Sequence, residues 1–276
     1  MDGRTYEGEA YAVLTDGGEL VFFRSEEKCK GGEITHVRDV LGNEYEGQVY
    51  TGVENTGKLF NSAPWYNQRS RVKAARVADG QSIAPKSCAG WFYYCRNMTA
   101  FEGAERLDTS AVTSMYGMFE CCHSLATPPD TSNWDTSKVT TMHCMFRGCL
   151  TMTVPPNTSH WVTSRVESMG SMFFGCKSLQ TPPDTSRWDT GKVTDMWGMF
   201  FHCYSLATPP DTSRWDTSSV VDMRDMFFDC AAMTEPPDTS WWDTSSLRWH
   251  ACMFDACDRL ERVPVIRPPI HEDSAR

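Results

Sequence analysis

Twelve cysteines are the first residues of this 276-residue chain whose type and spacing could carry chemistry. Stacked cysteines can form disulfides, and thiolates also bind zinc. Seven of them recur at one fixed spacing, an odd number that cannot pair completely, and the sequence contains no Cys-x-x-Cys pair of the kind found in zinc sites. We therefore expect reduced, buried thiols that behave as small hydrophobic residues. The seven cysteines that recur at one fixed spacing are Cys95, Cys122, Cys149, Cys176, Cys203, Cys230 and Cys257.

Aspartates form two further series with the same spacing. Stacked carboxylates could bind calcium or act as an acid–base pair, but charges about 5 Å apart repel each other. Aspartate in Asp-Thr-Ser can instead accept a hydrogen bond from the amide two residues on, as in an Asx-turn. We expect turn capping, with calcium as the alternative, although Val162 and Asn157 interrupt the two series. The series are Asp108, Asp135, Asp189, Asp216 and Asp243, and Asp130, Asp184, Asp211 and Asp238.

Neither histidines nor phosphate-binding motifs indicate an enzyme. The seven histidines share no recurring repeat position, and the chain contains no P-loop or glycine-rich dinucleotide motif. We predict a protein without catalytic residues, cofactor or metal. The net charge of −10 argues against a nucleic-acid partner, which would require a basic stripe.

Aromatic residues are the strongest candidates for a binding site. Phe174, Phe201 and Phe228 each follow a Met-Phe pair, and Trp197 and Tyr204 belong to the same segments. Stacked in neighbouring coils, they would form an exposed apolar stripe. Such patches mark interaction sites, and aromatic residues dominate binding hot spots. The alternative is that they pack between neighbouring elements and are partly buried.

A 27-residue repeat positions all these side chains. Fixed periods of this size are typical of repeat proteins, whose units stack into one continuous core. We predict a solenoid of about seven coils over residues 81–265, with a degenerate first copy at Trp91-Phe92. The tryptophans of the series are Trp134, Trp161, Trp188, Trp215 and Trp242, and the Met-Phe pairs begin at Met118, Met145, Met172, Met199, Met226 and Met253.

Each coil is predicted to contain a short parallel strand and a two-turn helix. Met196, Met199, Phe200 and Cys203 lie at i, i+3, i+4 and i+7, which is one face of a helix. Val193 with Met196 predicts a short buried strand. The Pro-Pro pair that follows cannot donate hydrogen bonds to a neighbour. The residues expected to cap the helices are Ser114, Thr141, Ser168, Asp195 and Asp222.

Residues 1–80 lack the repeat and are predicted to form a β-rich cap. Residues 11–14 and 20–23 flank Asp16-Gly17-Gly18, the pattern of a β-hairpin. Residues 34–40 and 72–77 predict further strands. Such a cap covers strand edges that an open stack would expose. Residues 266–276 are predicted to be a tail. The N-terminus lacks the basic-then-apolar pattern of a secretory signal, and the chain has no apolar run long enough for a membrane helix.

The repeat resembles that of BspA-like leucine-rich-repeat bacterial surface proteins. The similar pattern is W-D-T-S-x-V-T-x-M-x-x-M-F-x-x-C-x-S-L, and EAYAVLTDGGELVFF resembles the segment before the repeats in that family. The resemblance implies a leucine-rich-repeat-like α/β solenoid, a cell-surface or extracellular location, and binding to a host or neighbouring-cell protein. The chain departs from the family in having Thr-Pro-Pro where an aliphatic strand is usual, and in having few leucines.

Two function classes follow. The first is a protein-binding or adhesion surface, and the second is a structural spacer that displays other domains or assembles head to tail. A spacer predicts uniform exposed positions, whereas a binding protein predicts varied ones. Variation at the position before each tryptophan of the series mildly favours binding: Asn133, His160, Arg187, Arg214 and Trp241.

Overall fold

The N-terminal part of the chain forms a six-stranded sheet, and its hairpin was predicted correctly. The computed structural model describes residues 8–57, 59 and 61–266. Strand β1 (Glu9–Leu14) pairs antiparallel with β2 (Glu19–Ser25). Almost every residue of both strands is buried, because one face of the hairpin joins the main core and the other packs in a small second cluster around Tyr11, Val13 and Phe23.

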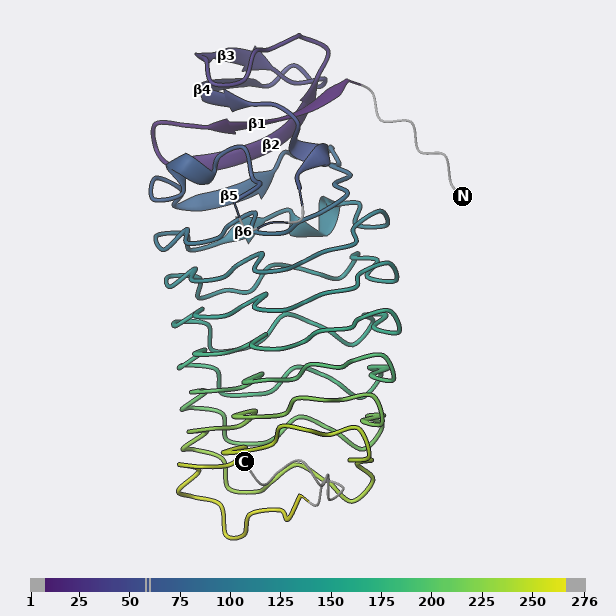
Figure 1. Ribbon diagram of the computed structural model, residues 1–276. Coiled ribbons are helices and arrows are strands. Elements are labelled where there is room, and N and C mark those ends of the chain that lie inside the picture. Colours follow the sequence, from purple (N-terminus) through teal and green to yellow (C-terminus); the bar gives the residue numbers. More distant parts are fainter. Residues whose placement is uncertain (1–7, 58, 60, 267–276) are drawn as a thin grey trace.

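The sheet changes from antiparallel to parallel where the coils begin. Its order is β3-β4-β1-β2-β5-β6, with β3 (Ile34–Arg38), β4 (Glu44–Tyr50), β5 (Ala74–Val77) and β6 (Phe101–Glu102). The β2–β5 and β5–β6 pairings are parallel. The strands predicted near residues 34–40 and 72–77 are present, whereas β4 was not predicted. Figure 1 shows the sheet at one end and the later coils stacked below it.

The repeat predicted from the sequence is confirmed in the stacking of the coils. Successive coils are joined by single parallel bridges one repeat apart, so the strand predicted in each coil is reduced to one bridging residue. Phenylalanine rings stack from coil to coil with centroids 5.3–5.6 Å apart, from Phe92 to Phe254. The bridges are Ser114↔Thr141, Thr141↔Ser168, Ser168↔Asp195, Asp195↔Asp222 and Asp222↔Trp249.

The predicted two-turn helices are wrong. The described residues contain no α-helix, only the 3-10 turns η1 (Val53–Asn55), η2 (Tyr66–Gln68) and η3 (Ala104–Arg106). In place of a helix, each coil has two consecutive four-residue turns.

In one coil the amide of Met118 donates to the carbonyl of Met115 at 3.2 Å, and the amide of Cys122 donates to that of Phe119 at 3.1 Å. The third residue of each turn, Gly117 and Cys121, has a φ of 54° and 59°. A positive φ at this position is the pattern of a type II turn.

These turns mimic the helical pattern because they bury all four corners and leave many of their central residues half-buried. The corners Met115, Met118, Phe119 and Cys122 are all buried. Corners at i and i+3 of two consecutive turns give the spacing i, i+3, i+4 and i+7, which is also one face of a helix. The same inward residues therefore suit both backbones.

Bonds between coils explain why the turns form. The amides of Met115, Gly117, Phe119 and Cys121 donate to carbonyl oxygens of the next coil at 2.6–3.0 Å. In a helix these amides would point along the helix axis to the carbonyl four residues earlier. The turns direct alternate amides to the next coil, so stacking satisfies them.

The opposite side of each coil contains the aspartates, and their predicted Asx-turns are confirmed. Asp216, for example, accepts a hydrogen bond from the amide of Ser218 at 3.0 Å. A buried threonine follows each position of the two series from Asp108 to Asp216, including Asn157 and Val162, and its hydroxyl bonds to the backbone of the next coil, which was not predicted. These threonines are Thr109, Thr131, Thr136, Thr158, Thr163, Thr185, Thr190, Thr212 and Thr217.

Candidate functional site

The central residues of the consecutive turns form a continuous surface along the stack. We call this surface the turn face: residues 116–117 and 120–121, and the equivalent positions of each later coil through 251–252 and 255–256. Its side chains differ from coil to coil although the core beneath them repeats. It is therefore a regular scaffold that presents a variable surface, as repeat proteins use for binding.

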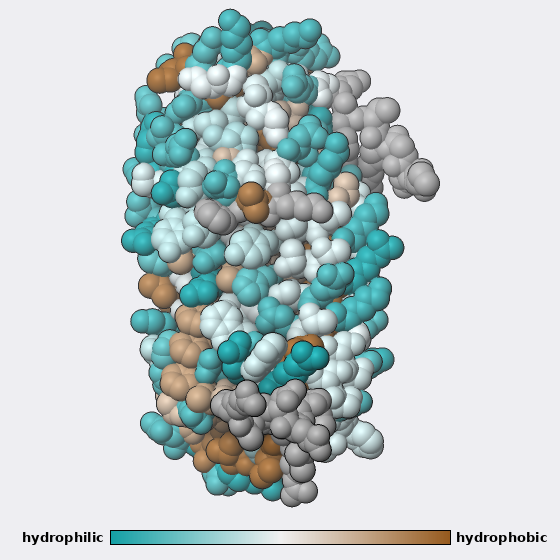
Figure 2. Space-filling model, viewed as in Figure 1, coloured by the Kyte–Doolittle hydropathy of each residue, from teal (hydrophilic) through white to brown (hydrophobic). Residues whose placement is uncertain are grey.

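Phe174, Phe201 and Phe228 form an aromatic column on the turn face. Their ring centroids are 4.4 Å and 4.9 Å apart, with the rings within 11° of parallel. Each side chain is half-buried, because its neighbours cover the ring faces and leave the ring edges in solvent. Figure 2 shows hydrophobic side chains gathered along the left edge of the lower half of the molecule, where the later coils lie.

The other two predicted residues flank this column. The Trp197 ring lies 6.1 Å from that of Phe174, and its Nε1 donates to a carboxylate oxygen of Asp225 at 3.2 Å. Tyr204 lies beside the column, with the ammonium of Lys177 5.5 Å from its ring. The structure therefore brings all five predicted residues into one region.

Polar partners of the column were missed by the sequence analysis. The guanidinium of Arg147 lies 4.3 Å from the centre of the Phe174 ring, a cation–π contact. His202 packs edge-on against Phe201 at 4.0 Å and bonds through Nδ1 to a carboxylate oxygen of Asp229 at 2.8 Å. The repeat spacing could have revealed Arg147, which occupies the position of Phe174 one coil earlier.

His143, Ser168 and Asp195 form a polar cluster across three successive coils, two of which also contain Phe174 and Phe201. The Ser168 hydroxyl donates to Asp195 at 2.7 Å, and His143 Nδ1 lies 3.1 Å from the Ser168 oxygen and 3.3 Å from Asp195 Oδ2. A catalytic triad needs the serine and the carboxylate on opposite ring nitrogens. Here both lie on Nδ1, so no proton relay is built.

This cluster shifts the pKa values of His143 and Asp195. Burial lowers the pKa of His143, but the bonds to Asp195 and Cys144 outweigh burial and raise it to about 9. Burial raises the pKa of Asp195, and its bonds with His143, Ser168 and the Trp197 amide outweigh this and lower it. An ion pair between His143 and Asp195 therefore joins coils across two steps of the stack.

The thiols that recur once in every coil are free and buried, as predicted. Each thiol from Cys122 onward donates to the carbonyl of a phenylalanine in the coil before it, at 3.0–3.3 Å. Burial raises the pKa of Cys176 to about 12, although its bond with Cys149 opposes the shift. Thiols that are protonated at neutral pH are poor nucleophiles. These cysteines therefore act as packing residues of the hydrophobic core.

Metal-binding groups and membrane-spanning helices are both absent from the described residues. Among the described residues no group of three or more His, Cys, Asp or Glu side chains could hold a metal ion. None of the helices in the described part is long and apolar enough to cross a membrane.

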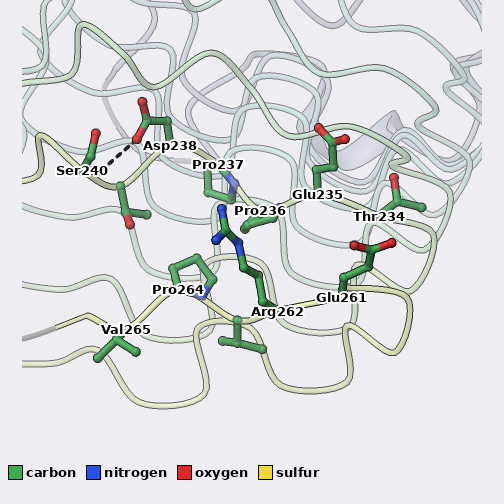
Figure 3. A pocket seen from close by; sticks show the side chains of 12 residues that line it. Thr234, Glu235, Pro236, Pro237, Asp238, Ser240, Glu261, Arg262, Pro264 and Val265 are labelled. Atoms are coloured by element: carbon green, nitrogen blue, oxygen red, sulfur yellow. Dashed lines mark hydrogen bonds between the residues drawn. The ribbon is translucent and has the colours of Figure 1, made fainter.

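A groove of 1040 Å³ lies between Pro236-Pro237 and the segment with Pro264, with the Arg262 side chain extending between them (Figure 3). It shares no residue with the aromatic column.

Solved structures similar to the chain include three bacterial leucine-rich-repeat proteins. That of T. pallidum is 16% identical, with 94% of this chain and 90% of that chain covered and a TM-score of 0.41. One from Eubacterium ventriosum is 16% identical over 94% and 90%, with a TM-score of 0.28. A leucine-rich cell surface protein of Faecalibacterium prausnitzii is 13% identical over 93% of each chain, with a TM-score of 0.18.

A search of the curated proteins finds no match to this sequence. One protein family does match, over residues 86–184 and again over residues 180–263. The two matches contain all the coils with the Met-Phe pairs, and together they span more than half of the chain. The chain therefore belongs to the family described as "Mycoplasma protein of unknown function, DUF285".

Proposed function

We propose that the chain is a non-enzymatic, BspA-like surface protein that binds another protein through its turn face, in the manner of an adhesin. The observation that carries the proposal is the aromatic column of Phe174, Phe201 and Phe228, with Trp197 and Tyr204 beside it. These side chains are half-exposed and stacked in register, so they form a rigid apolar surface. Rigid aromatic groups lose little conformational entropy on binding, which makes them effective contact residues.

In this proposal each part of the chain has a separate role. Residues 1–80 cap the stack, residues 81–265 form a leucine-rich-repeat-like solenoid that displays the turn face, and residues 266–276 are a tail. Of that tail, residues 267–276 lie outside the described residues. The partner is a host or neighbouring-cell protein, and the protein acts outside the cell or at its surface, as the resemblance implies.

The test is a binding assay against immobilised extracellular proteins. The purified chain is expected to retain a saturable partner, and the W197S/F201S double variant is expected to lose that binding. Trp241 is 77% exposed and lies on the opposite side of its coil, so W241S is the matched control and should bind as the wild type does. Unchanged binding by a folded W197S/F201S variant would overturn the proposal.

A spacer that assembles head to tail is a second candidate, and the last coil favours it. In earlier coils, alternate amides donate to the next coil. The equivalent amides of His250, Cys252, Phe254 and Ala256 have no acceptor among the described residues. Edge amides of this kind can pair with another chain. Filaments that lengthen with concentration, together with no saturable partner, would support the spacer.

A further inference from the structure

The aromatic column ends in opposite charges. Five consecutive residues of this row, each one coil after the last, are Arg147, Phe174, Phe201, Phe228 and Asp255, and Glu120 precedes them. Arg147 covers the outer face of the first ring at 4.3 Å. Asp255 follows the last ring and is exposed. From Arg147 to Asp255 the row is therefore cationic, then apolar over three coils, then anionic.

The charge order of this row is complementary to that of the same row in a second copy that runs in the opposite direction. A twofold axis that crosses the row at Phe201 places Arg147 of one copy opposite Asp255 of the other, and the same pair forms a second time by symmetry. The axis also places Phe174 opposite Phe228. Because all rungs have the same sequence spacing, both ion pairs form together with the aromatic contacts. Twofold dimers require such self-complementary surfaces.

The neighbouring rows of the turn face accommodate this arrangement. The axis that crosses Phe201 places Asp229 opposite Gly175, and Arg224 opposite Gly170. Each charged side chain thus meets a glycine, which leaves room for it, and no two like charges oppose each other in these rows. A parallel arrangement would instead place Arg147 opposite Arg147 and Asp255 opposite Asp255, which is repulsive.

Both charged ends are available to a partner. One third of the Arg147 side chain is exposed, and its contacts with Glu120 at 3.9 Å and with the Cys144 sulfur at 4.0 Å leave guanidinium donors for a partner. Asp255 forms no ion pair with any residue in the described part of the chain. Charge complementarity of this kind determines orientation as well as attraction.

We propose that a second copy of this chain, running antiparallel, binds the turn face and forms a twofold dimer centred on Phe201. The proposal rests on the proposed function, since it names a partner for the same surface. Adhesion would then occur between two copies, with each copy supplying one Arg147 and one Asp255 to the two ion pairs.

Charge exchange followed by sedimentation velocity tests the orientation. The wild type is expected to dimerise with rising concentration, and R147D or D255R alone to weaken the dimer by roughly tenfold or more. An equimolar mixture of the two variants should restore dimers, because each reversed charge then meets its complement. The double variant R147D/D255R should also restore them. R187D, with the same charge change on the opposite side of the coils, should dimerise as the wild type does.

Cross-linking keeps the test independent of those variants. In a C252S background, which removes the exposed thiol, F201C places two thiols at the axis and should form a disulfide-linked dimer in air. F228C should not, because Phe228 lies opposite Phe174. A wild type that stays monomeric, single variants that dimerise normally, or a mixture that restores nothing would each overturn the antiparallel dimer. Partner binding lost in W197S/F201S but with a monomeric wild type would leave the proposed function standing and reject only this inference.

Discussion

Thr163 and Asp189 exchange two hydrogen bonds across neighbouring coils. The Thr163 hydroxyl donates to the Asp189 carbonyl at 2.9 Å and accepts from the Asp189 amide at 2.8 Å. Thr163 is buried, so losing these bonds leaves backbone groups without a partner. A buried group left unpaired in this way costs about 1–3 kcal/mol.

T163V is therefore expected to lower the free energy of unfolding by about 1–3 kcal/mol, because valine has the same shape without the hydroxyl. T163S keeps the hydroxyl and loses one methyl, so it should cost only about 0.8 kcal/mol. Urea unfolding of both variants measures the difference. Equal stabilities for the two variants would show that the hydroxyl contributes nothing.

The positive φ at Gly175 makes a prediction that separates turns from helices. Gly175 has a φ of 71°, and a Cβ added there meets nothing nearer than the Gly148 Cα at 3.9 Å. In a helix, Gly175→Ala would stabilise by about 1 kcal/mol. In the turn, alanine must adopt a left-handed conformation, so the substitution should destabilise by about 1–2 kcal/mol.

The sign of the change in thermal unfolding temperature decides between these outcomes. Gly175→Asn is the control, since asparagine tolerates the left-handed region better than alanine, and it should cost less. An alanine variant more stable than the wild type would contradict the turn.

The sequence predicted the features of the fold that depend on side-chain periodicity. The repeat register, the inward Met, Phe and Cys residues and the Asx-turns all follow from residue type and spacing. The backbone between Met115 and Cys122 could not be predicted, because two consecutive turns bury the same residues as a short helix. A longer segment would have distinguished a period of four from 3.6, but eight residues are too few.

The positions of the candidate site residues could also be predicted from the repeat spacing, but their hydrogen bonds could not. Phe174, Phe201 and Phe228 share a repeat position, so their proximity follows from stacking alone. Hydrogen bonds across coils depend on which side chain faces the next coil, and so the role of Thr163 was not predicted. Whether the five aromatic residues bind a partner stays a prediction.

The ion pair of His143 with Asp195 predicts a pH dependence. The pKa of His143 is raised to about 9, so charged His143 stabilises the fold fully below about 6.5, and this stabilisation is lost as the pH rises through 9. The pKa of Asp195 is lowered, so its contribution is present above its ordinary value of 3.8 and is lost as the pH falls below it. This pair should therefore contribute most between about pH 4 and 6.5.

Titration of the histidine ring protons by NMR measures this directly. His143 should titrate near 9, and D195N should lower its pKa by removing the charge that stabilises the imidazolium. His123 is the internal control, since burial and Arg96 lower its pKa below 6.5. If His143 titrates with His123 in the wild type, the ion pair does not form in solution.

The free thiols should differ sharply in reactivity with an alkylating reagent. Cys252 is exposed, whereas Cys176 is fully buried and its pKa is raised to about 12 by burial. Hydrogen bonding to Asp255 raises the pKa of Cys252, so its alkylation should accelerate as the pH is raised from neutral. The buried thiols from Cys95 to Cys230 that recur in each coil should react only when the coils open, because both access and the thiolate are missing.

Mass spectrometry of peptides after timed alkylation of the native protein gives each rate. In urea all twelve cysteines should react at similar rates, which controls for the reagent. Cys176 at the centre of the stack should be slower than Cys257 in the last coil, since Cys257 is partly accessible and its pKa is raised only to about 11. Alkylation of Cys176 at the rate of Cys252 in the native protein would show that the coils do not stack as described.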